Sequence, residues 1–163
     1  MTTRTTSDNC SSNIKFRESQ IDDLPTIVQL LADDFLGEQR ECLEDPPLES
    51  YFNAFREIDA DPNQELIVAE LDGEIVGTLQ LIIIPSLSYQ GGKRSSVESV
   101  RVDSRYRGKG IGREMMLWAI ERAKERGCIS MQLTSHNDRQ DAHRFYEQLG
   151  FSRSHVGMKL SLK

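Results

Sequence analysis

A glycine-rich, basic loop carries the clearest chemistry in this sequence. Residues 105–112 read Arg-Tyr-Arg-Gly-Lys-Gly-Ile-Gly, and an amphipathic helix pattern begins inside them and continues to Arg126. Backbone N–H groups at the start of a helix have no intrahelical partner and lie at the positive end of the helix dipole. Glycines let a ligand approach the main chain, and Arg107 and Lys109 add positive charge. The loop therefore predicts a site for the phosphates of a cofactor.

Two common phosphate motifs do not fit this loop. The sequence contains no Gly-x-x-x-x-Gly-Lys-Ser/Thr, and Gly112 comes one residue too early for the dinucleotide-binding Gly-x-Gly-x-x-Gly pattern. From the glycines alone, a turn with solvated cations remains an alternative to a phosphate site.

Two flanking segments help to decide between a phosphate site and a simple turn. Val100-Arg101-Val102 precedes the loop, and Phe145-Tyr146-Glu147-Gln148-Leu149-Gly150-Phe151 follows it about 40 residues later. Together with the loop they resemble the GCN5-related N-acetyltransferase (GNAT) superfamily over roughly residues 14–160. The resemblance implies an α/β (α+β) fold with a mixed, mostly antiparallel sheet of about seven strands, flanked by about four helices and splayed at its central strands.

The resemblance also implies a cofactor, acetyl-CoA used as co-substrate. In this family the main chain of the central strand pairs with the pantetheine arm, which assigns that role to Val100, Arg101 and Val102. Asn137 resembles an asparagine that contacts the same arm, and Tyr146 lies beside the sulfur. The loop amides bind the pyrophosphate, which by resemblance involves Arg107, Gly108, Lys109, Gly110, Ile111, Gly112 and Arg113.

Transfer of an acetyl group to an amine requires a base. An alkylamine with a pKa of about 10 is almost fully protonated near neutrality and must lose a proton before it attacks a thioester. Glu98 stands where many family members place a glutamate that does this, directly or through water. A solvent-facing strand carboxylate is the alternative interpretation.

The departing thiolate needs a proton or a hydrogen bond, and Tyr146 resembles the family tyrosine that supplies it. A core tyrosine with a satisfied hydroxyl is the alternative. The implied enzyme is an acetyl-CoA-dependent N-acetyltransferase that moves the acetyl group to a primary amine in a ternary complex. A non-catalytic acyl-CoA sensor, or a protein or peptide lysine or N-terminal acetyltransferase, would share these features.

Other reactive side chains are weaker candidates. Cys128 could act as a covalent acyl carrier, but it follows the glycine that ends a helix pattern and has no neighbouring histidine, so we expect a small buried side chain. His136 and His155 are candidates for lining the acceptor site. Neither the cysteines nor the histidines show metal-ligand spacing, so no metal site is predicted.

The elements that must position these groups follow from apolar periodicity and turn residues. Asp72-Gly73 predicts a tight hairpin turn, and irregular alternation near Val100 suggests a β-bulge. The expected strands are residues 14–16, 66–71, 74–84, 95–102, 128–133 and a closing strand 151–160; the expected helices are residues 24–31, 48–58, 110–126 and 138–148.

Composition limits the class of protein. The length of 163 residues and 37% hydrophobic content fit one domain, taken as residues 13–163 after a disordered tail, residues 1–12. No apolar run is long enough for a membrane span, and the net charge of −6 argues against a nucleic-acid binder. Widely spaced cysteines favour a reducing cytoplasm. A homodimer is possible, since dimers are common in the family.

The acceptor is the least determined partner, and a small amine or a peptide would fit. Residues 22–61 carry 12 acidic side chains and only two basic ones, and family members build the acceptor pocket from this region. Such a surface would attract a cationic acceptor. Ordinary solvation of exposed helix faces explains the same charges, so both interpretations stay open. The loop 86–94, with Tyr89, is the other expected contributor.

Overall fold

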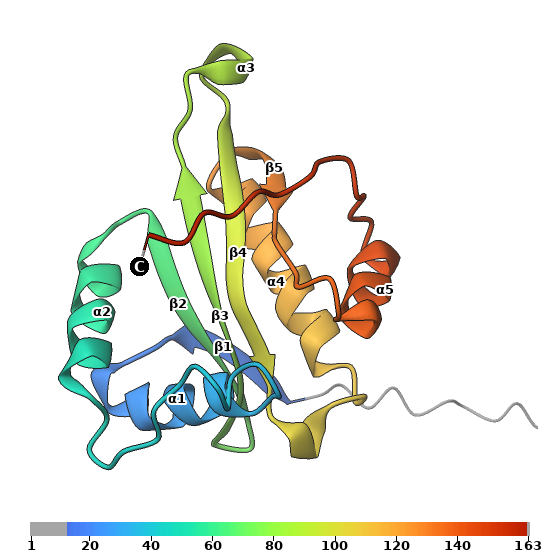
Figure 1. Ribbon diagram of the computed structural model, residues 1–163. Coiled ribbons are helices and arrows are strands. Elements are labelled where there is room, and N and C mark those ends of the chain that lie inside the picture. The colour runs from blue at the N-terminus through green and yellow to red at the C-terminus, as the bar shows by residue number, and fades with distance from the viewer. Residues whose placement is uncertain (1–12, 163) are drawn as a thin grey trace, which may run out of the picture.

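The structure, a computed structural model, describes residues 13–162, and its centre is a five-stranded sheet in the order β1-β2-β3-β4-β5 (Figure 1). Strands β1 to β4 are antiparallel neighbours, whereas β5 runs parallel to β4. The strands are β1 (Ile14–Glu18), β2 (Gln64–Leu71), β3 (Glu74–Ile84), β4 (Lys93–Val102) and β5 (Cys128–Gln132).

Helices cover both faces of the sheet (Figure 1). On one face α4 inserts Met115, Met116 and Ala119 between buried strand residues, forming the main core. On the opposite face α1 and α2 form a smaller cluster around Val28 and Phe55. The helices are α1 (Leu24–Ala32), α2 (Glu49–Ala60), the short α3 (Ser88–Gly91), α4 (Ile111–Glu125) and α5 (Gln140–Gln148), with 3-10 turns at Ile21–Asp23 and Ser104–Tyr106.

The hairpin between β2 and β3 confirms the turn prediction. Asp72 and Gly73 have φ angles of 52° and 86°, both in the left-handed region that a two-residue hairpin of this type requires. Aspartate tolerates this region better than most residues, and glycine adopts it without steric cost.

A bulge in β4 divides the strand into two parts, as the irregular alternation predicted. Gln80 pairs with Glu98 while Thr78 pairs with Arg101, so β4 has one residue more than β3 between these pairs. Ser99 takes up the difference with a φ of 54°. On its other side β4 pairs with β5 only from Lys93 to Ser96. Beyond Ser96 this edge of β4 has no strand neighbour within the described sheet, and we call the unpaired edge of residues 97–102 the wedge.

The strand count and the closing strand are corrected by the structure. The described residues form five strands, not about seven, and residues 151–160 are not a strand. Their alternation is typical of a strand, but a strand also needs a partner edge, and none binds them within the described chain. Four helices of nine or more residues agree with the expected number. The predicted disordered tail, residues 1–12, lies outside the described residues.

Among the helices of residues 13–162, none combines the length and apolar character needed to cross a bilayer.

An ion-pair cluster fastens the start of α1 to the sheet. Arg17 of β1 donates to both carboxylate oxygens of Asp23, at 2.6 and 3.0 Å, and to Glu70 of β2 at 2.9 and 3.0 Å. The hydrogen bond from Arg17 lowers the pKa of Asp23 despite partial burial. Because the folded pKa lies below the usual value of about 3.9, the cluster stabilises the fold above about pH 4 and loses this effect as the pH falls through the lowered pKa.

We expect Asp23→Asn to lower the free energy of unfolding by about 1–2 kcal/mol at pH 7, allowing for the partial solvent exposure of Arg17. Urea denaturation of both proteins at pH 7 and at pH 3 measures the difference, which should shrink at the lower pH. Asp59→Asn, at an exposed position on α2, is the matched control and should change stability by less than about 0.5 kcal/mol. An equal loss at both pH values would contradict the assignment.

Candidate active site

The glycine-rich loop leads from β4 into the first turn of α4, as the sequence predicted. Gly108 and Gly110 have φ angles of 77° and 88°, and Gly110 is the N-cap of α4. No side chain caps this helix, and the first bond into it is Glu114 N–H to Gly110 O at 3.1 Å. Within the described chain, the N–H groups of Ile111, Gly112 and Arg113 therefore have no acceptor.

The space in front of these N–H groups is open. A Cβ atom placed on Gly108 or Gly110 would meet nothing within 4 Å. Gly112 lies deeper, where a Cβ would be 3.5 Å from Val102 Cγ2 and 3.7 Å from Phe145 Cζ. Unpaired amides, the helix dipole and open access are the features of an anion site at a helix N-terminus.

The charged side chains of the loop have different surroundings. Arg107 turns back toward α1, donating to Val102 O at 3.0 Å and pairing with Asp33 Oδ2 at 3.1 Å. Its side chain therefore links the loop to the end of α1. Only the main chain of Arg107 is left to contact a ligand at the loop. Lys109 Nζ lies 4.9 Å from the centre of the Tyr106 ring, and Arg113 is exposed.

The unpaired edge of β4 brings main-chain groups without a strand partner next to this loop. Val100 and Val102 pack their side chains against the main core, so their main-chain groups are what they can offer a ligand. Both carbonyls already accept hydrogen bonds from guanidinium groups at 3.0 Å, Val100 O from Arg101 and Val102 O from Arg107.

Tyr146 lies near the end of α5 in an aromatic setting. Its ring meets Phe145 edge-on at 5.1 Å and Phe151 at 5.9 Å, measured between ring centres. Burial raises the pKa of Tyr146, Arg101 and Arg139 oppose this effect, and Glu98 adds to it. The hydroxyl therefore stays protonated near neutrality, as a proton donor must.

Glu98 is carried by β4 just before the bulge, opposite Gln80 of β3. It is partly buried, and its Oε1 accepts a hydrogen bond from Ser96 Oγ at 2.8 Å. The charge of Glu98 also raises the pKa of the Tyr146 hydroxyl, so the two side chains lie within electrostatic range of each other.

A charged cluster that sequence reasoning missed joins three distant segments at this site. Asp34, just after α1, accepts from Gly37 N–H at 2.7 Å and from Arg139, and its Oδ2 lies 3.3 Å from Arg101 Nε. Burial would raise the pKa of Asp34, but Gly37 N–H and the two arginines outweigh it and hold the pKa below its usual value.

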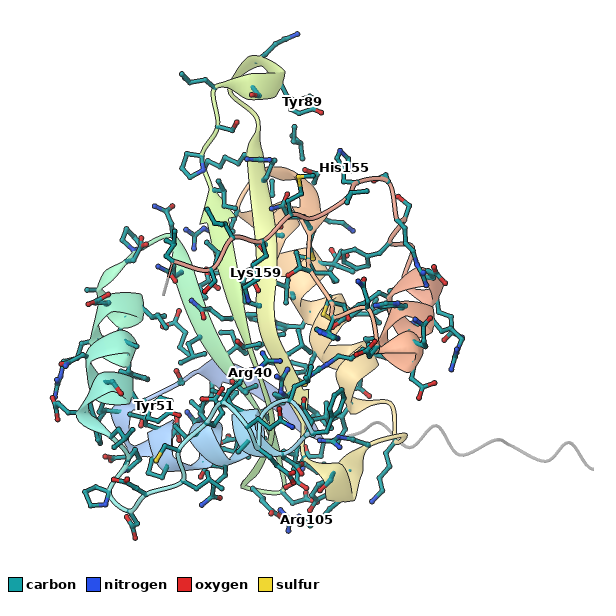
Figure 2. The ribbon with its side chains drawn as sticks, viewed as in Figure 1. Arg40, Tyr51, Tyr89, Arg105, His155 and Lys159 are labelled. Atoms are coloured by element: carbon teal, nitrogen blue, oxygen red, sulfur yellow. The ribbon has the colours of Figure 1, made fainter. Side chains whose placement is uncertain are left out.

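Positive charge exceeds negative charge within this cluster. Arg101 and Arg139 share the single carboxylate of Asp34, and Arg40 adds to the positive potential at Arg101. Figure 2 shows Arg40 above α1, in front of the lower part of the sheet. No local spacing pattern links these residues, so the sequence offered no signal for the cluster.

The other candidate residues from the sequence lie outside this charged cluster. Asn137 is exposed in the loop before α5, where its carbonyl accepts from Gln140 Nε2 at 2.7 Å. His136 is also exposed there, and His155 lies on the C-terminal segment. Cys128 begins β5 and packs against the main core, but it is only partly buried and not fully buried as expected. Residues 13–162 contain no cluster of His, Cys, Asp and Glu suited to a metal ion.

Comparison with known proteins identifies relatives of this chain. The model of the Acetyltransferase (GNAT) family matches residues 24–151. Aminoalkylphosphonate N-acetyltransferase of Salmonella typhimurium is 33% identical over 95 residues, covering 58% of this chain and 61% of that protein. Glucosamine 6-phosphate N-acetyltransferase of Trypanosoma brucei brucei is 34% identical over 90 residues, covering 55% and 59%. The chain thus spans about three fifths of these curated relatives.

The matches to solved structures cover more of the chain than the matches to the curated relatives do. A crystal structure described as a transcriptional regulator from Bacillus halodurans C-125 is 52% identical with a TM-score of 0.89, and the match covers 91% of this chain and 99% of that one. Glucosamine-6-phosphate N-acetyltransferase from Arabidopsis thaliana is 25% identical with a TM-score of 0.75, covering 92% and 99%.

The loop geometry generates a test with an internal control. Gly110→Val should weaken coenzyme A binding at least about tenfold, or about 1.4 kcal/mol, because a β-branched residue disfavours φ near 88° and fills the space before the amides. Isothermal titration calorimetry measures the affinity.

Gly73→Val is the matched control for this substitution. Gly73 has a φ of 86° and open surroundings, but it lies in the β2–β3 turn. The control carries similar backbone strain and should bind coenzyme A as the unmodified protein does. Equal affinity of Gly110→Val and the unmodified protein would remove the loop as the phosphate site.

Proposed function

Because this chain belongs to the Acetyltransferase (GNAT) family, we propose that it transfers the acetyl group of acetyl-CoA to a primary amine of a small acceptor. The transfer is a direct attack in a ternary complex. The observation that carries the proposal is the position of Tyr146, a protonated and partly buried hydroxyl that shares its surroundings with Glu98 at the wedge beside β4.

The cofactor would lie along the wedge and end at the loop. The unpaired N–H groups from Ile111 to Arg113 suit the diphosphate, together with the open backbone at Gly108, Lys109 and Gly110. The main chain of Val100, Arg101 and Val102 suits the pantetheine amides, and the exposed Asn137 would contact the same arm. Because the Arg107 side chain is paired with Asp33, Lys109 and Arg113 would supply the positive charge for the diphosphate.

The chemistry removes two protons from the nitrogen and adds one proton to the sulfur. Glu98 takes the proton of the incoming ammonium, directly or through a water molecule, and the free amine then attacks the carbonyl carbon of the thioester. A C–N bond forms as the C–S bond breaks, and Tyr146 gives its proton to the departing sulfur. The second proton of the attacking nitrogen passes to the Tyr146 phenolate, directly or through a water molecule, and Glu98 releases its proton to bulk water after the products leave.

The charge around the site favours an acceptor that carries an anionic group. The acidic residues expected to attract a cation are partly neutralised, since Asp33 pairs with Arg107 and Asp34 with two arginines. Arg40 is exposed beside this cluster and free to meet a ligand. The Salmonella typhimurium and Trypanosoma brucei brucei relatives are named for amines that bear a phosphonate or a phosphate, which matches this charge.

A second candidate function is binding of acyl-CoA without turnover. The 52% identical Bacillus halodurans structure is described as a transcriptional regulator, which favours such a sensor. The joint presence of Glu98 and Tyr146 favours catalysis, because a sensor needs neither a base nor a proton donor. Thiol release from acetyl-CoA with a panel of amines and lysine peptides separates the two, and tight binding with no release supports the sensor.

Tyr146→Phe should reduce kcat at least about tenfold, because the departing thiolate loses its proton donor. Thiol release at saturating acetyl-CoA measures the rate, and calorimetry should show coenzyme A affinity changed less than about threefold, since the aromatic contacts remain. A kcat within about twofold of the unmodified enzyme would contradict the role of Tyr146.

The acceptor class has its own test. Glucosamine 6-phosphate and 2-aminoethylphosphonate should show KM values at least about tenfold below those of glucosamine and ethanolamine, as expected when an arginine binds the anion. Arg40→Gln should raise KM for the anionic pair and leave the neutral pair unchanged. Arg56→Gln, at an exposed arginine of α2, should affect neither. Better turnover of the neutral acceptors would contradict an anion subsite.

A further inference from the structure

A small apolar cavity lies between α1, α2 and the sheet, on the face opposite α4. Its volume is about 100 Å³, and its walls include Val28 and Leu31 of α1 and Phe55 of α2. Figure 2 shows Tyr51 where α1 and α2 meet and Arg40 above α1, both in front of the sheet. An unfilled cavity lacks the contacts of a packed core, so a ligand that fills this space would gain them.

The cavity borders the residues that we assign to the transfer. Gln80 of β3 lies on its floor and pairs with Glu98 of β4. Thr78, also on the floor, pairs with Arg101. Opposed residues of an antiparallel pair project from the same face of the sheet, so Glu98 and Arg101 lie on the side of the cavity. Ser99, between them in the chain, lines the cavity itself. The base and the charged cluster are therefore next to the cavity, one strand away from its floor.

The polar side chains of β3 in the floor already have partners. Thr78 Oγ1 donates to Ile67 O at 2.9 Å. Gln80 Nε2 donates to Gln64 Oε1 at 2.6 Å. Because the rest of the lining is mostly hydrocarbon, the cavity suits an alkyl group better than the hydroxyl groups of a sugar, which would lose their hydrogen bonds to water there.

We propose that the acceptor carries, besides its amine and its anionic group, a branched alkyl group of about four carbon atoms that occupies this cavity. An apolar cavity of about 150 Å³ binds benzene, so one of about 100 Å³ holds roughly four carbon atoms. The amine then meets Glu98, the alkyl group enters the cavity, and the acid group meets the arginines. An amino acid with an isobutyl side chain has this form, and so does its phosphonate analogue. This acceptor class rests on the transferase function proposed above.

Thiol release with two matched acceptor series tests this acceptor class. Leucine and 1-amino-3-methylbutylphosphonate carry the isobutyl group, whereas glycine and aminomethylphosphonate lack it. Burial of one methylene favours binding about fourfold, so kcat/KM should be at least about thirtyfold higher with the isobutyl group in one or both series. Tryptophan exceeds the cavity and should fall at least about tenfold below leucine. A preference absent from both series, or one that continues to rise to tryptophan, would overturn the assignment.

Two substitutions should shift this selectivity in opposite directions. Ala54→Leu adds a side chain where Ala54 lines the cavity, and should lower the ratio of kcat/KM for the isobutyl and truncated acceptors at least about tenfold. Leu31→Ala enlarges the cavity and should raise the tryptophan-to-leucine ratio by about the same factor. Ala60→Leu, at the exposed end of α2, is the matched control and should leave both ratios unchanged. A ratio within one variant does not depend on the folded fraction, so unchanged ratios in both cavity variants would overturn the assignment.

Calorimetry separates the cavity from the transferase function. The isobutyl compounds and their truncated counterparts are titrated onto the protein saturated with coenzyme A, which has no acetyl group to transfer. Binding of an isobutyl compound at least about thirtyfold tighter, with no thiol release from acetyl-CoA, would contradict the transferase and retain the cavity assignment. Thiol release with equal affinities in both series would support the transferase and overturn the cavity assignment.

Discussion

The site depends on one constraint, that every buried or ligand-facing main-chain group must find a partner. Two features of the fold leave such groups unpaired in the same place. The bulge at Ser99 and the short pairing of β4 with β5 open the edge of the central strand, and the uncapped start of α4 presents N–H groups beyond it. A cofactor that combines a diphosphate with an amide-bearing arm satisfies both, so the fold selects its ligand mainly through backbone geometry.

Side chains then set the charge around this backbone frame. Asp34 links the loop after α1, the end of β4 and the loop before α5, because it accepts hydrogen bonds from the main chain of Gly37 and from Arg139 and forms an ion pair with Arg101. The same arginines favour the ionised form of Tyr146, yet burial outweighs them. The positive surplus is therefore compatible with a protonated hydroxyl and an anionic acceptor in one site.

The same constraint applies to the C-terminal segment, residues 152–160. An alternating apolar segment is stable when it has both a hydrogen-bonded edge and a covered face, and its own chain supplies neither to residues 152–160.

The sequence by itself determined the local features: the Asp72-Gly73 turn, the bulge near Val100 and the helix start at Gly110, because each depends on the conformational preferences of a few adjacent residues. It could not specify which edge the alternating residues 151–160 would join, since alternation defines an apolar face and not a partner. Nor could it bring Asp34 to Arg139, which lie 105 residues apart. Only the packing of α1, β4 and α5 around the sheet decided that contact, because burial and ion pairing act between neighbours in space.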